Sequence, residues 1–466
     1  MEVPTCAGCL ERDGRIAELE ARVLELEGKL RDLTDKLDRL INPKVRRPAP
    51  ELPAGPPKKA TGRKAGGQEG HPAHLKAVLP PERVKETFSF VPTECTKCAS
   101  PLSEKAGPND PPPTRHQVAE LPSVAADITE YQGHYRTCSC CGEVNHRAIP
   151  AQLCQHSIGP LLTGFVSYLS GCHGVSKRAI EEIVEGVFEV PIALGTVANL
   201  EQEMSAALAP AHREAVLAIQ AAPVKHVDET GWKQAGHKRW LWVGATTSAV
   251  AFLIQPWRNL KALMRLVGEN FVGILCSDRW SVYDEWPWER RQVCWAHLKR
   301  NWEKMAERGG WAKRIADECL SVQRRVFEQW HLYRGGGCGG RKFHDGMGPL
   351  FVELLAILGE GARGKDRKTA RFCRRLKSIY PALWTFVDNE GVEPTNNHAE
   401  RVQRRAVLWR RRSFGCHSAD GCRFVERILT VVQTLRLQKR PVLTYLCHAI
   451  RAHRSALQPP PLLAAG

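Results

Sequence analysis

Two acidic residues in the middle of the chain each follow a short apolar segment. Asp228 follows residues 224–227, and Asp278 follows residues 274–277. We predict that both segments are strands and that each aspartate ends its strand. Carboxylates held close together raise each other's pKa unless a cation lies between them. Such oxygen ligands favour Mg²⁺ or Mn²⁺, and a pair of these ions can hold both oxygens of a phosphodiester displacement.

A third carboxylate is needed to hold a second ion, and Glu400 is the candidate. It lies in PTNNHAERVQRR, at the start of a predicted long helix. Asn396 or Asn397 is expected to cap this helix, which leaves Glu400 in the first turn, facing the sheet.

Each aspartate has an acidic neighbour that is an alternative metal ligand. Glu229 is next to Asp228, and Asp284 follows Asp278 in SDRWSVYD. Asp278 is favoured because it ends its predicted strand directly. A single acid at a strand end is commonly a turn residue, so the hypothesis depends on the order of the three acids in one sheet.

The elements expected around these acids follow the order of an RNase H-like mixed sheet. Three strands are predicted within 225–256, then a helix, a buried strand ending at Asp278, and a strand running into a helix in RRQVCWAHLKRNWEK. In this order the first and fourth strands are neighbours. We therefore predict a multidomain α/β protein with a catalytic core at 222–440. Its helical insertion spans about 300–390, and a C-terminal tail follows at 441–466.

The charge of the chain indicates a polyanionic partner. The formal net charge is +17, and nucleic acid is the commonest partner of such proteins. A basic Pro/Gly-rich linker is predicted at 43–75, where glycines flank Arg63 and Lys64 and would let them enter a DNA minor groove. Further arginines suited to phosphate contacts follow Glu400, namely Arg401, Arg404 and Arg405.

An N-terminal coiled coil is predicted at 10–42. Its aliphatic residues alternate steps of three and four, and such a narrow seam needs a partner helix. We therefore expect a homo-oligomer. The seam consists of Ile16, Leu19, Val23, Leu26, Leu30, Leu33, Leu37 and Leu40.

Two Cys-x-x-Cys pairs predict a zinc-binding module at 88–150. They are Cys95 with Cys98 and Cys138 with Cys141, and four thiolates suit a structural Zn²⁺. The gap between the pairs is long for a compact zinc ribbon, and short strands are expected to fill it.

A helix-turn-helix DNA-binding domain is predicted at 156–208. VSKRAIEEIVEGVF places its apolar residues on one helical face, and a second helix is expected near GTVANLEQEM. Two short helices around a tight turn can place the second one in a major groove.

The N-terminal sequence and the apolar segments predict a cytoplasmic protein. No apolar segment reaches the roughly 18–20 residues that cross a bilayer. MEVPTCAGCLERDG lacks the basic and then apolar pattern of a signal peptide. We expect a bacterial, nucleoid-associated protein whose cysteines are thiols or metal ligands.

Together these segments resemble the transposases of the insertion sequence 66 family, which carry a D-D-E triad. The resemblance rests on GRKAGGQEGHP, the paired cysteines, VDETGW, CWAHLKRNW, TNNHAERVQRR and the block SFGCHSADGCRFVERILTVVQTLRLQKRPVLTYL. It implies the triad Asp228, Asp278 and Glu400, and it places His297 near the active site. It also assigns the four paired cysteines to zinc, with Ala99 where a glycine usually follows the first pair.

The resemblance implies strand cleavage at transposon ends and transfer of the 3′-hydroxyl into target DNA, with Mg²⁺ or Mn²⁺ and accessory proteins. Two alternatives remain open at this point. One is a DNA-binding regulator with an inactive RNase H-like scaffold. The other is a metal-dependent nuclease without strand transfer.

Overall fold

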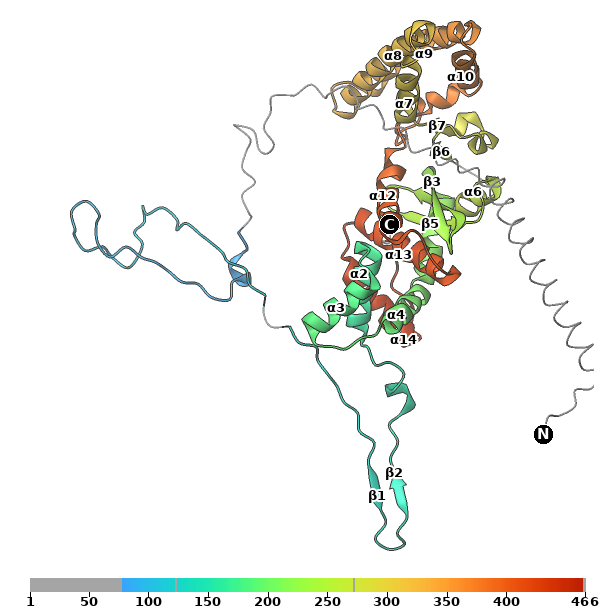
Figure 1. Ribbon diagram of the computed structural model, residues 1–466. Coiled ribbons are helices and arrows are strands. Elements are labelled where there is room, and N and C mark those ends of the chain that lie inside the picture. The colour runs from blue at the N-terminus through green and yellow to red at the C-terminus, as the bar shows by residue number, and fades with distance from the viewer. Residues whose placement is uncertain (1–77, 122–123, 271–272, 464–466) are drawn as a thin grey trace, which may run out of the picture. The chain divides into compact units, whose positions relative to one another are not determined.

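The computed structural model describes residues 78–121, 124–270 and 273–463 (Figure 1). The chain divides into two compact units, Met1–Glu120 and Leu121–Gly466. The predicted coiled coil and basic linker, with Arg63 and Lys64, lie outside the described residues. Within the described part of the chain, no helix is long and apolar enough to cross a membrane.

The second unit contains a five-stranded mixed sheet with the strand order β5-β4-β3-β6-β7. β4 is antiparallel to both β3 and β5, whereas β6 runs parallel to β3 and β7 runs parallel to β6. The predicted neighbourhood of the first and fourth strands is therefore confirmed. The strands are β3 (Val224–Gln234), β4 (His237–Ala245), β5 (Val250–Gln255), β6 (Ile274–Ser277) and β7 (Arg291–Val293).

The two predicted strand ends have different outcomes. Asp278 directly follows β6, as predicted. The prediction that the first strand ends at Asp228 is wrong, because β3 continues to pair with β4 as far as Gln234 opposite His237. Asp228 therefore lies within β3, just beyond the part of this strand that pairs with β6.

Helices surround this sheet and form the rest of the unit (Figure 1). The segment 300–390 is mainly helical, as predicted, and has its own hydrophobic core around Trp295 and Trp302. A short hairpin, β1 (Tyr135–Thr137) with β2 (Val144–His146), precedes the helices. In chain order the helices are α2 (Pro160–His173), α3 (Lys177–Phe188), α4 (Leu194–Ala207), α5 (Ala209–Ala221), α6 (Leu260–Val267), α7 (Trp295–Ala306), α8 (Gly310–Arg334), α9 (Gly340–Arg363), α10 (Arg367–Ser378), α11 (Thr385–Asp388), α12 (Asn397–Ser413), α13 (Ala419–Leu437) and α14 (Val442–Arg454).

The two faces of the sheet have separate cores because side chains alternate along each strand. Leu241 and Val243 pack against α12 and α13. Trp242, between them, packs on the other face with α5 and α6. Gly244 follows on that same face, where a Cβ atom would come within 2.9 Å of Ile219. This alternation decides which side chains of β3 can face α12.

Helices α2, α3 and α4 occupy the segment predicted as a helix-turn-helix. The charged residues of α4 are Glu201 and Glu203, which form ion pairs with Lys177 and Arg454. Neither acid would attract DNA phosphates, and a DNA-reading role for α4 remains a prediction.

The segment 441–466, left as a tail by the sequence analysis, contains α14. Leu446 and Ile450 of this helix are fully buried in the core that also holds α4, α5 and α13. Helix α14 is therefore part of the folded unit.

Helix α13 closes the free edge of the sheet at β5. Three alternate backbone N–H groups of β5, at residues 250, 252 and 254, donate hydrogen bonds to α13 side chains one turn apart. The helix therefore takes the place of a further strand, and it leaves no open edge there for another chain. The acceptors are Thr434 Oγ1, Thr430 Oγ1 and Glu426 Oε1.

Glu426 permits a matched test of this edge. Burial raises its pKa to about 7. The folded protein therefore loses stability as the pH rises from about 4.5 towards 7, because the unfolded chain releases the Glu426 proton more readily than the folded one. We expect Glu426→Gln, which keeps the acceptor without the charge, to be at least as stable as the wild type at pH 8. Glu426→Met should lower the free energy of unfolding by about 1–3 kcal/mol, because the Ile254 N–H loses its acceptor. Urea unfolding of the three proteins measures this, and equal stability of the Gln and Met variants would contradict it.

Candidate active site

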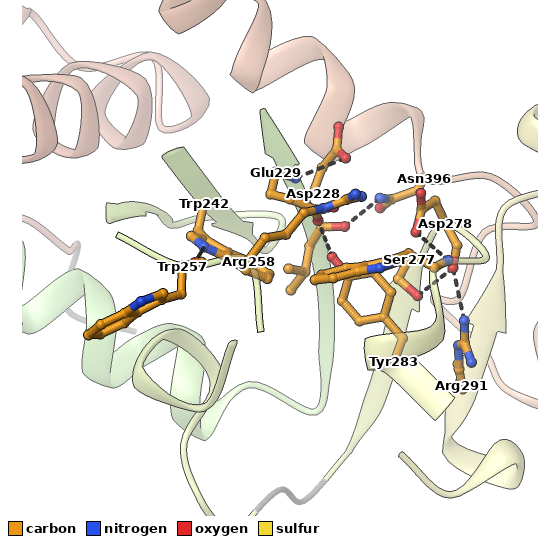
Figure 2. A network of polar contacts seen from close by, with 12 residues as sticks. Asp228, Glu229, Trp242, Trp257, Arg258, Ser277, Asp278, Tyr283, Arg291 and Asn396 are labelled. Atoms are coloured by element: carbon orange, nitrogen blue, oxygen red, sulfur yellow. Dashed lines mark hydrogen bonds and ion pairs between the residues drawn. The ribbon is translucent and has the colours of Figure 1, made fainter. Parts of the chain in front are cut away.

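Asp228 and Asp278 lie at the same level on neighbouring parallel strands. The register pairs His226 with Cys276, and each aspartate comes two residues later in its strand direction. Because side chains alternate, both aspartates point to the face of the sheet that α12 covers. Figure 2 shows them with the polar network around them.

Asp228 is a half-buried acid, and the groups around it do little to stabilise its charge. Burial, together with the charges of Glu229, Asp278 and Glu400, raises its pKa to about 8, against a hydrogen bond from the Glu229 N–H that lowers it. Among the described residues, no lysine or arginine forms an ion pair with Asp228. The ionised carboxylate therefore lacks a cation, which a divalent metal would supply.

Glu229 faces the opposite side of the sheet, and its carboxylate is already paired (Figure 2). Arg258 donates to Glu229 Oε1 from Nε at 2.8 Å and from Nη2 at 2.5 Å, and the Tyr283 hydroxyl donates to Oε2. The Arg258 guanidinium also lies over the Trp280 ring at 3.9 Å. The Glu229 side chain is only 2% exposed. These contacts indicate a structural role for Glu229 rather than a role as a metal ligand.

Asp284, the alternative to Asp278, is also paired. It accepts a hydrogen bond from Arg291 at 2.7 Å and forms an ion pair with Arg375. The Arg291 side chain is only 1% exposed, and it also donates to the Asp278 carbonyl at 3.0 Å. Asp278 itself accepts the Trp280 N–H at 2.8 Å, and no ion pair involves it among the described residues.

Asn396 fixes the start of α12 against the sheet. It is the N-cap residue, but the predicted capping by its side chain is wrong. The side chain instead donates from Nδ2 to the Val227 carbonyl at 2.8 Å, and its Oδ1 accepts a hydrogen bond from His226 Nδ1 at 3.0 Å. Both partners directly precede Asp228 on β3. The clamp therefore sets the position of the first turn of α12 relative to Asp228 (Figure 2).

Glu400 lies in this first turn and is one third exposed. Its Oε1 is 3.5 Å from His297 Nδ1 and 3.4 Å from Arg300 Nη2. Asp228, His297 and Glu400 line one open pocket of about 520 Å³, together with Arg401 and Arg404 of α12. The pocket thus combines carboxylates for a cation with guanidinium groups for phosphate.

His297 has a ring nitrogen, the buried Nδ1, without a hydrogen-bond partner among the described residues. Burial and the charge of Arg300 lower the pKa of His297. Cys294 Sγ, a ring nitrogen of His297 and a Glu400 oxygen lie within 4.8 Å of one another. This environment suits a metal ligand or a hydrogen bond to substrate.

The predicted DNA-contacting arginines of α12 have exposed side chains. Arg401, Arg404 and Arg405 are all exposed, and they follow Glu400 along the helix. Arg410, further on, is instead bound to the Thr230 hydroxyl at 2.9 Å. The exposed arginines are free to approach a phosphate backbone beside the pocket.

The predicted zinc ligands form two turns, one in each unit. The Ala99 N–H bonds to the Cys95 carbonyl at 2.9 Å, and the Gly142 N–H bonds to the Cys138 carbonyl at 2.9 Å. Ala99 has φ 57° where the second turn has Gly142 at φ 74°, so the first turn carries the strain expected from its sequence. Backbone N–H groups of Cys141 and Cys140 lower the pKa of the Cys138 thiol. A hydrogen bond from Ser100 does the same for Cys98. A shared zinc ion stays a prediction.

A model described as "Transposase IS66 family" matches residues 158–423, more than half of the chain. The chain belongs to this transposase family. The matched region includes Asp228, Asp278, His297 and Glu400, and so contains the whole pocket described above.

The chain is also similar to a protein of Sinorhizobium fredii. This Sinorhizobium fredii protein, described as "Uncharacterized protein y4qI", is 25% identical over 239 residues. The alignment covers 46% of the present chain and 43% of the relative. The chain therefore matches less than half the length of that protein.

Proposed function

We propose that the chain is a D-D-E transposase that cleaves DNA at the ends of an insertion sequence and joins the freed 3′-hydroxyl to target DNA. Asp228, Asp278 and Glu400 would hold Mg²⁺ or Mn²⁺. The sheet order, with the first two acids at one level of neighbouring strands, supports an RNase H-like core. Family membership supports the transposition chemistry.

One observation carries the choice of residues. Asp228 has no ion pair among the described residues, whereas the neighbouring acids Glu229 and Asp284 are each paired with an arginine. Keeping an uncompensated acid buried costs stability, so its retention points to a function that uses the charge. Asp228 and Glu400 line the same pocket, and a cation between them would remove the electrostatic cost.

The residues of the chain have distinct tasks in this proposal. When bound, divalent ions would activate the attacking oxygen and stabilise the leaving oxygen. Arg401, Arg404 and Arg405 would hold DNA phosphates beside the pocket. Asn396 positions Glu400 through its bonds to β3. His297 would donate to or accept from a group beside the scissile phosphate.

The remaining segments would recognise DNA and assemble subunits. We assign the cysteine pairs to structural zinc, and the linker with Arg63 and Lys64 and the segment 156–208 to recognition of the element ends. The coiled coil at 10–42 would pair subunits. Accessory proteins are further expected partners.

The test is Mg²⁺-dependent cleavage and joining of a labelled duplex that carries the ends of the host element. Wild-type protein should cleave and then join the DNA. Specific binding without cleavage, with partner proteins supplied, would favour the regulator. Cleavage without joined products would favour a nuclease.

The two acids of SDRWSVYD should give opposite results. Asp278→Asn should abolish cleavage while leaving the free energy of unfolding nearly unchanged. Asp284→Asn should lower that free energy by about 3–5 kcal/mol, because buried Arg291 loses its charged partner. Chemical denaturation and the cleavage assay on both variants check this. If the Asp284→Asn protein were inactive but as stable as the wild type, Asp284 rather than Asp278 would be the metal ligand.

A further inference from the structure

The junction between β7 and α7 contributes metal-binding side chains beside the proposed triad, and one of them, Cys294, has no role in the D-D-E chemistry. Cys294 follows β7 and is the N-cap residue of α7, and His297 lies in the first turn of that helix. Residues three apart in a helix project to the same side, and this side meets the first turn of α12. Glu400 of α12 completes the set, with all three ligand atoms within 4.8 Å of one another.

The contacts of these three residues favour coordination. Cys294 is fully buried, and its Sγ accepts the Asn396 N–H at 3.1 Å. Burial raises the pKa of the Cys294 thiol, against this hydrogen bond, so a thiolate here needs a bound cation as well as the Asn396 donor. The buried Nδ1 of His297 has no hydrogen-bond partner among the described residues. It points towards Glu400 Oε1 at 3.5 Å, beyond a good hydrogen bond.

We propose that Cys294, His297 and Glu400 form a site for Zn²⁺ or a similar transition-metal ion, next to the proposed magnesium site. Sulfur and imidazole ligands select such ions and are poor ligands for Mg²⁺. Tetrahedral zinc ligands are about 3.4–3.7 Å apart, so the side chains would need to close by only about 1 Å. Three protein ligands would leave one position of the ion open, towards the pocket.

The site shares Glu400 with the proposed triad. A carboxylate oxygen bound to Zn²⁺ beside Cys294 is withdrawn from the neighbouring cation site. Micromolar Zn²⁺ should therefore inhibit Mg²⁺-dependent cleavage. This consequence rests on the proposed function, whereas the metal site itself does not.

Cobalt substitution tests the site without any need for activity. Co²⁺ bound to a thiolate gives a charge-transfer band in the near ultraviolet. We expect the full-length wild-type protein, preloaded with one equivalent of Zn²⁺, to show this band on addition of Co²⁺. Cys294→Ala should lose the added band, and Cys319→Ala, which removes another fully buried thiol, should keep it. The cysteine pairs at 95/98 and 138/141 are present in all three proteins.

Two further variants test the other ligands. His297→Gln and Glu400→Gln should weaken Co²⁺ binding at least about 10- to 100-fold, the loss found even when indirect partners of a metal are removed. Identical cobalt spectra of wild type and Cys294→Ala would overturn the proposal. If the band depends on Cys294 but Zn²⁺ leaves cleavage unchanged, Glu400 is not shared and that part of the proposal is wrong. If no cleavage occurs under any condition, the proposed function fails while the spectra still report on the site.

Discussion

Asp228→Asn should produce a protein that is inactive and more stable than the wild type when no divalent metal is present. We expect cleavage to fall by about a hundred- to a thousandfold or more, as when a group that stabilises transition-state charge is removed. DNA affinity should be unchanged, because phosphate contacts dominate it. The gain in stability follows from burial, which raises the pKa of Asp228 from 3.8 to about 8.

The sign of the pH effect is fixed by this raised pKa. Between pH 4 and 8 the folded protein holds a proton that the unfolded chain releases, so wild-type stability falls as the pH rises. The slope is at most about 1.4 kcal/mol per pH unit. The asparagine variant has no such group, and its advantage should be largest at pH 8 and absent near pH 4.

Thermal unfolding in EDTA across this pH range measures the effect, and added Mg²⁺ provides the control. Mg²⁺ should raise the melting temperature of the wild type by binding the folded state, and should do so less for Asp228→Asn. An Asp228→Asn protein that is less stable than the wild type at pH 8 would show that a cation of the protein already neutralises Asp228.

Glu400→Gln should abolish cleavage without the gain in stability. Glu400 is one third exposed and lies near His297 and Arg300, so loss of its charge removes only weak surface attraction, worth about 0–1 kcal/mol. Cleavage should again fall by about a hundred- to a thousandfold. Cleavage and joining of the labelled element ends, with DNA binding measured in parallel, test this.

Glu303→Gln is the matched control for Glu400→Gln. Glu303 lies on α7, is about half exposed and pairs with Lys299 one turn away. It should retain wild-type cleavage, which excludes a general effect of removing a carboxylate from this part of the surface. Wild-type cleavage by Glu400→Gln would mean that the third acid lies elsewhere in the chain.

Local sequence patterns were sufficient to predict most of the sheet around the site. Alternating apolar residues and the strand–helix order predicted five strands in their observed sequence, and these patterns depend only on neighbouring residues. The length of β3 was missed, because VDETGW has three consecutive polar residues, Asp228 to Thr230, but stays paired with β4. The polar residues there are accommodated by contacts from other elements, which a local pattern does not contain.

The residues that support the acids could not be predicted for a similar reason. Arg258 reaches Glu229 across 29 positions, and Arg375 reaches Asp284 across a longer gap. Asn396 was expected to cap its own helix, but its side chain instead bonds to His226, which is 170 positions away in the sequence. Cys294 had a visible signal, since a cysteine three residues before His297 has the spacing of paired metal ligands.

The contact of α13 with β5 has a consequence for synthesis of the chain on the ribosome. The Ile254 N–H can bond to Glu426 only after the ribosome has added 172 further residues. At translation rates of 5–20 residues per second this is roughly 10–30 s during which the edge of β5 has no cover. Premature termination before α13 would make the exposure permanent. Truncated products of this gene should therefore aggregate or associate through β5, while the complete chain protects the same edge with its own helix.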